Sequence, residues 1–70
     1  MNIIEAIQQA EKGVFITNNF KKHNNLLLKY IGNGVFYEYQ LVEGTLIYKS
    51  KIDKFSMAEI FSVSWEMIQI

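Results

Sequence analysis

The residues with the greatest capacity for chemistry lie in one polar stretch between positions 18 and 25. This stretch holds four asparagines, two lysines, the only histidine of the chain and one phenylalanine. A nucleophile–base pair would have to use His23, because the chain has no cysteine and no second histidine. No acidic residue is near His23 in the sequence to orient its imidazole. We therefore expect His23 to be an exposed loop residue or a hydrogen-bond donor to a ligand, and not a general base.

The other groups that could do chemistry have structural explanations. The carboxylates show no metal-ligand spacing, and a single histidine without cysteine makes a structural zinc site unexpected. Glu59 is explained as a helix cap and Glu66 as a strand-surface residue. Gly32-Asn33-Gly34 lacks the helix and the lysine–serine or lysine–threonine pair of a phosphate loop, so it predicts a hairpin turn. We expect no catalytic residues, no metal, no cofactor and a protein that is not an enzyme.

The composition restricts the partners of this protein. Seven lysines balance seven acidic residues and there is no arginine, which argues against a nucleic-acid polymer as the partner. A chain of this length buries only roughly 60% of its unfolded surface. Without cysteine no disulfide can compensate, and the many aromatic residues exceed what so small a core can bury. We therefore expect a homo-oligomer, either a dimer or a tetramer.

No apolar run approaches the ~20 residues that a membrane span needs. The first residues also lack the basic and apolar regions of a signal peptide. The sequence therefore predicts a cytoplasmic protein without a membrane partner.

The polar stretch is flanked by the elements of an α+β fold in one small domain over residues 1–70. An asparagine cap, apolar residues at helical spacing and a terminating glycine predict a helix over residues 2–12. Ser56 and Glu59 form a capping box for a short helix that is apolar on one side, and a terminal strand with Trp65 follows. β-branched and aromatic runs predict four strands, over residues 14–17, 26–31, 35–41 and 45–52.

This order predicts one antiparallel β-sheet meander with its helices on one face, so the opposite face lacks cover. We expect Leu46, Tyr48 and Ile52 to share one face of the fourth strand, at the two-residue period of a strand. The strand aromatics allow two interpretations, a stacking surface for a nucleobase or cross-strand packing at an oligomer interface. These aromatics are Tyr30, Phe36, Tyr37, Tyr39 and Tyr48.

The two ends of the chain each carry a recognisable segment. The chain begins Met-Asn-Ile-Ile-Glu-Ala-Ile and reaches Lys12-Gly13. Residues 56–68 read Ser-Met-Ala-Glu-Ile-Phe-Ser-Val-Ser-Trp-Glu-Met-Ile. These segments resemble the first helix and the closing segment of phage proteins of the second Thoeris anti-defence type. The middle of the chain matches only in its strand pattern.

Three departures from the family pattern concern the functional region. Thr17 and Asn18 stand where the family has arginines, Phe20 replaces the tryptophan of the loop with an offset of about one residue, and Ser64 replaces the aspartate before the closing tryptophan. With no arginine, backbone amides and lysine would have to hold a phosphate. The altered loop suggests a different signal from that of the best-known members, and an ADP-ribose conjugate or a cyclic oligonucleotide is conceivable.

The resemblance implies a non-catalytic sponge in the cytosol of the host bacterium. Similar proteins form homo-oligomers that hold an ADP-ribose-derived immune signal, such as a cyclic ADP-ribose isomer, in pockets between subunits. Here Phe20 would stack on a base and Lys22 would neutralise phosphate, while the asparagines and His23 would contact ribose hydroxyls or base edges. The ligand-binding residues that this interpretation predicts are Asn18, Asn19, Phe20, Lys22, His23 and Asn24.

Two other functions stay open at this point. A small phage inhibitor that acts by direct protein–protein contact, in the manner of an anti-CRISPR protein, would explain the short chain and its tyrosines. A minor structural domain without a ligand is the third interpretation. In every case we expect Trp65 to pack helix against sheet and Ser56 to cap a helix.

Overall fold

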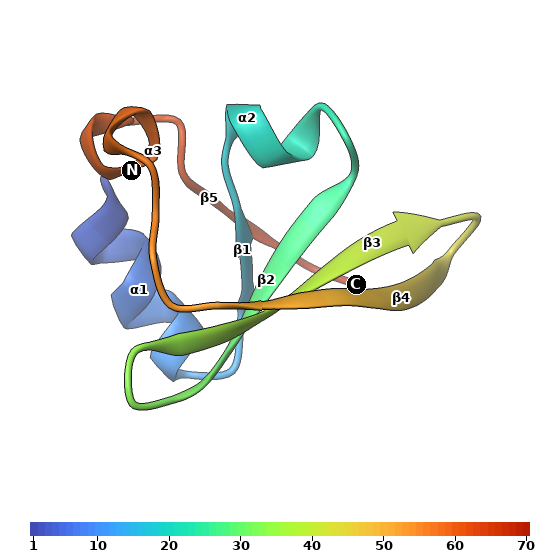
Figure 1. Ribbon diagram of the computed structural model, residues 1–70. Coiled ribbons are helices and arrows are strands. Elements are labelled where there is room, and N and C mark those ends of the chain that lie inside the picture. The colour runs from blue at the N-terminus through green and yellow to red at the C-terminus, as the bar shows by residue number, and fades with distance from the viewer.

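The structure is a computed structural model that describes all residues 1–70, and it has the predicted α+β fold (Figure 1). One five-stranded antiparallel sheet has the strand order β4-β3-β2-β1-β5. None of the helices has the length and apolar character needed to cross a membrane. In chain order the elements are α1 (Ile3–Glu11), β1 (Phe15–Thr17), α2 (Asn19–Lys22), β2 (Leu26–Gly32), β3 (Val35–Val42), β4 (Thr45–Ile52), α3 (Met57–Phe61) and β5 (Glu66–Ile68).

The first helix begins and ends where the sequence predicts. Asn2 and Glu5 form a capping box at its start, in which the Asn2 side chain accepts from the Glu5 amide at 2.9 Å. Gly13 follows the helix with φ of +91°, a conformation that a side chain would strain. Ala6 and Ala10 are buried, and their small side chains let α1 approach β1 and β2 closely.

The core lies between α1 and one face of the sheet. Trp65 is buried at 2% exposure, and its ring meets Phe55 edge-to-face at 5.5 Å. Its Nε1 donates to the Glu59 carbonyl oxygen at 2.9 Å, so the indole joins the helical side to the sheet as predicted. The buried apolar residues around it are Ala6, Ala10, Ile16, Leu28 and Phe36.

The last strand completes the sheet at the edge opposite β4. Phe15 pairs with Ile68 and Thr17 with Glu66, so β5 lies beside β1 although residues 18–65 separate them in the chain. The nitrogen of Met1 donates to the carbonyl oxygens of Val63 and Trp65, at 3.1 and 2.9 Å. The N-terminus therefore lies beside α3, whereas the C-terminus lies at the other end of β5, as Figure 1 shows.

One prediction about β4 is wrong because of a β-bulge. Glu38 pairs with Ser50 whereas the next residue, Tyr39, pairs with Tyr48, so Lys49 has no partner on β3. An extra residue reverses the alternation of faces along a strand. Ile52 therefore packs against the core, while Tyr48 lies on the opposite face and does not share a side with it.

A second difference concerns the polar stretch, which the sequence predicts as a loop. Residues 19–22 form the short helix α2, and Asn18 caps it. An asparagine side chain serves a helix N-terminus as readily as a turn, because in both places it accepts a nearby backbone N–H.

Truncation of Leu28 tests the position of the core. Leu28→Ala should lower the free energy of unfolding by about 2–5 kcal/mol, because a fully buried leucine leaves a cavity. Val63→Ala is the control, since Val63 is 78% exposed and its truncation should change stability by no more than about 0.5 kcal/mol. Urea unfolding followed by Trp65 fluorescence measures both, and equal effects would contradict this core.

Candidate functional site

Asn18 faces the interior of the protein, and its side chain holds the helix of the candidate site in place. It is fully buried, and its Oδ1 accepts from the Lys21 amide at 2.9 Å as the cap of α2. Its Nδ2 donates to Glu59 Oε2 at 3.0 Å, which ties α2 to the glutamate of the α3 capping box. Of the predicted ligand-binding residues, Asn18 is thus the one whose side chain the structure places away from solvent.

The other predicted residues lie together on the exposed side of α2 and just after it. Phe20 exposes 54% of its surface, although it is a large aromatic residue. The side chains of Asn19, His23 and Asn24 are exposed and make no hydrogen bond within the chain. Lys22 is exposed and forms an ion pair with Glu66 at 3.0 Å.

Two hydrogen bonds to backbone atoms hold this exposed segment in place. The Asn19 amide donates to Ser64 Oγ at 3.1 Å, and the Asn24 carbonyl accepts from Gln40 Nε2 at 3.2 Å. The main chain of the segment is therefore held by β3 and by the residues before β5, while its side chains stay available to a ligand. Ser64, one of the departures from the family pattern, has a positioning role here.

Lys21 is the residue that sequence reasoning missed. Its Nζ lies 2.7 Å from a carboxylate oxygen of Glu38 and 3.4 Å from one of Glu59, and the three side chains are only 11–13% exposed. Ser50 Oγ adds a longer contact to Glu38 at 3.5 Å. In the sequence Lys21 and Lys22 are an undistinguished pair, and nothing indicates that one points inward and the other outward.

The pKa of Glu59 is lowered from its ordinary value of 4.5. Partial burial acts to raise this pKa, since it disfavours the charged form. The hydrogen bond from Asn18, the charge of Lys21 and the backbone bond from Ser56 act in the opposite direction and together outweigh burial. Glu59 is thus held as a carboxylate that joins α2, α3 and the Lys21 ammonium.

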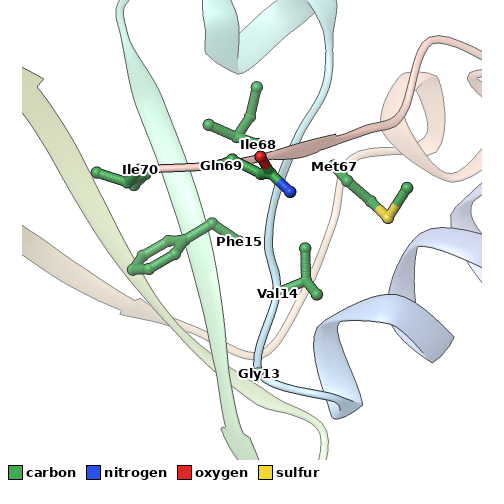
Figure 2. A pocket seen from close by; sticks show the side chains of 7 residues that line it. All are labelled: Gly13, Val14, Phe15, Met67, Ile68, Gln69 and Ile70. Atoms are coloured by element: carbon green, nitrogen blue, oxygen red, sulfur yellow. The ribbon is translucent and has the colours of Figure 1, made fainter.

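A separate cavity of about 660 Å³ opens beside the β5 edge of the sheet (Figure 2). Its walls come from residues 13–15 and 67–70 and are mostly apolar. None of the predicted ligand-binding residues lines it. It lacks a charged side chain, so it does not suit a phosphorylated ligand.

No group of three histidine, cysteine, aspartate or glutamate side chains gathers where a metal ion could bind. Comparisons with known proteins add nothing to the geometry: no protein family, no curated protein and no solved structure matches this chain.

The lowered pKa of Glu59 predicts part of the acid sensitivity of the fold. A carboxylate with a lower pKa in the folded than in the unfolded chain stabilises the fold above pH 4.5, and this contribution disappears as the pH falls through the folded pKa. Glu59→Gln should therefore be less stable than the parent at pH 7, and the difference should shrink toward pH 3. Urea unfolding across this pH range measures it.

Glu43→Gln is the control for the acid experiment. Glu43 is exposed in the β3–β4 turn and forms no ion pair, so this variant should keep the pH profile of the parent. A Glu59→Gln difference that is the same at pH 7 and pH 3 would contradict the charge-based role.

Proposed function

We propose that this protein is a nucleotide-signal sponge, which binds and sequesters an ADP-ribose-derived immune messenger without cleaving it. The observation that carries the proposal is the exposed group on and after α2, where an aromatic ring, a lysine, an imidazole and carboxamides stand on an anchored backbone. The resemblance of the chain ends to the second Thoeris anti-defence type supports the same function.

The side chains of this group fit the parts of a nucleotide. Phe20 offers an exposed ring to an adenine, and such stacking is worth about 1–3 kcal/mol per base. The pair between Lys22 and Glu66 is exposed, and exposed pairs contribute little, so a phosphate can replace the carboxylate at small cost. His23, Asn19 and Asn24 supply hydrogen-bond groups for ribose hydroxyls and base edges.

A sponge needs affinity and no turnover, and the anchoring of α2 serves affinity. Lys21 and Asn18 fix the helix to β3 and α3, and the Asn19 amide fixes its start to Ser64. A binding segment that is already ordered loses less conformational entropy when the ligand arrives. The proposed messenger would therefore meet a preorganised surface.

The proposal includes a homo-oligomer, a dimer or tetramer in the host bacterial cytosol, with ligand pockets between subunits. One surface suited to self-association is the outer side of α3, where Met57, Ile60 and Phe61 recur at helical spacing and are 39–73% exposed. Val63, which follows them, is also exposed. The core does not need these side chains, because Phe55 and Trp65 on either side of α3 pack into it instead.

The same apolar surface favours one alternative, a small phage inhibitor that binds a protein target directly. A contiguous set of exposed apolar side chains often marks a protein-interaction site. In this alternative the α2 group would be dispensable and the α3 surface would carry the activity.

Native mass spectrometry tests the sponge directly. The purified protein, after incubation with extract from cells with an activated cyclic-ADP-ribose immune system, should carry extra mass that is released intact on denaturation. Phe20→Ala with Lys22→Ala should lose at least about tenfold in retention, because base stacking and phosphate neutralisation disappear. Phe20→Trp should keep retention, and Lys12→Ala, an exposed lysine at the end of α1, is the control.

The absence of added mass in every preparation would contradict the sponge proposal. A complex that survives the Phe20 and Lys22 substitutions would keep the function but remove these residues from its site.

Infection assays separate the two functions. If α3 serves only to bind a protein target, Met57→Ser with Phe61→Ser should leave messenger retention per folded oligomer unchanged. The same variant should then no longer protect the phage from the host defence. For the sponge, we expect protection to follow messenger retention across all variants. Protection that persists in the Phe20→Ala, Lys22→Ala variant while retention is lost would decide for the protein inhibitor.

A further inference from the structure

A row of alternating aromatic and lysine side chains crosses the uncovered face of the sheet. Lys29 pairs with Tyr37 across β2 and β3, and Tyr37 pairs with Lys51 across β3 and β4. On the other side of Lys29 lies Phe15 of β1, with the lysine Nζ 5.8 Å from the centre of its ring. The order across four neighbouring strands is thus aromatic, lysine, aromatic, lysine.

The rings of this face form one connected cluster. Tyr39 and Tyr48 form the next row, and their rings lie 6.0 Å apart. Tyr37 contacts both of them, and Phe15 meets Tyr39 at 6.1 Å. Tyr48 exposes 52% of its surface, and the other three rings are half-buried. The predicted aromatic surface is smaller than the sequence indicated, because Tyr30 and Phe36 pack on the core side.

The charge of this face is positive although the chain is neutral. Lys29 and Lys51 are exposed and neither is in an ion pair. The strand alternation places one carboxylate on the same face, that of Glu66, and it is paired with Lys22. Glu38 points to the opposite side, where it binds Lys21.

These charges argue against a second copy of the chain as the cover of this face. Two such faces in contact would bring the unpaired lysines of both copies into a poorly solvated interface without carboxylates to meet them. Burial of unpaired charges is strongly unfavourable. The chemistry that complements rings and unpaired ammonium groups is a planar base linked to phosphate.

The dimensions of the row fit a small ligand. Neighbouring strands are about 4.8 Å apart, so Phe15 and Lys51 are separated by roughly 14 Å across three spacings. Two lysines neutralise few phosphates, so a long strand would gain little affinity beyond the part that covers the row.

We propose that the face formed by Phe15, Lys29, Tyr37, Tyr39, Tyr48 and Lys51 is a binding site for a nucleoside phosphate, with the base against the rings and the phosphate between the two lysines. This site is distinct from the α2 group, and it does not depend on the proposed function. A chain with both sites would contact nucleotides at two places.

Two-dimensional ¹H–¹⁵N NMR with ADP as the probe tests the site. ADP should shift the amide signals of the central residues of β2, β3 and β4, while adenosine and inorganic pyrophosphate alone should bind at least about tenfold more weakly, because each lacks one of the two contacts. Lys29→Gln with Lys51→Gln should raise the Kd for ADP at least about tenfold, and Tyr37→Leu should also weaken binding. Lys12→Gln is the control, and its Kd should equal that of the parent. The dispersion of each spectrum verifies that the variant is folded.

Several results would overturn the proposal. They are the absence of shifts with ADP, shifts confined to residues 18–25, and a Kd that the Lys29 and Lys51 substitutions leave unchanged. Tighter and steeply salt-dependent binding of hexathymidylate would make a nucleic-acid strand the occupant instead. Concentration-dependent shifts of this face without ligand would make it a contact between copies. Shifts confined to residues 18–25 would contradict the sheet site but remain consistent with the α2 site. ADP binding on the sheet without messenger retention would contradict the sponge proposal and support the sheet site.

Discussion

The arrangement of the candidate site depends on one ammonium group, that of Lys21, held between the carboxylates of Glu38 and Glu59. A helix as short as α2 has no stability of its own, because the first turn fixes several residues for a single hydrogen bond. Lys21 fastens it to β3 and α3 at once. Removal of one partner from so poorly solvated a group typically costs about 3–5 kcal/mol, since the remaining charge is left uncompensated. Two carboxylates around one lysine are tolerable because Asn18 and the Ser56 backbone also donate to Glu59.

The small core has consequences for the surface. Only nine residues are buried, and the filling of the core by Trp65, Phe55 and Phe36 leaves no room for the apolar side of α3 or for the tyrosines of the outer sheet face. These two uncovered surfaces differ in chemistry. The α3 surface is aliphatic and aromatic without an unpaired lysine among its exposed side chains, which suits a protein contact or a second copy. The sheet face mixes rings with lysines, which suits an anion.

The sequence was sufficient for features that are set by local interactions. The Asn2 cap, the Ser56–Glu59 capping box, the terminating glycine and the hairpin at Gly32-Asn33-Gly34 follow from neighbouring residues alone, and so do the four strands before α3. It was insufficient where a distant partner decides. Asn18 and Lys21 face inward because Glu59 and Glu38, far along the chain, are there to receive them. The bulge at Lys49 is likewise a property of the β3–β4 pairing, and no turn residue in the sequence of β4 indicates it.

The net charge of zero describes the whole chain, but the structure distributes the charges unevenly. This distribution decides which phosphorylated partners the neutral charge argues against. Lys21 and Lys22 meet Glu38, Glu59 and Glu66 at the end of the sheet near α2, so two positive charges are more than balanced by three negative ones in that region. Among the other charges, α1 on the core side carries Glu5 and Glu11 and ends at Lys12, whereas Lys29 and Lys51 stand on the outer face. A long nucleic acid senses the whole molecule and gains little from such a chain. A ligand that fits on one face senses the lysines nearest to it, because charges beyond about 10 Å are largely screened at physiological salt. Neutrality therefore argues against a polymer partner and leaves a small phosphorylated ligand fully compatible with this protein.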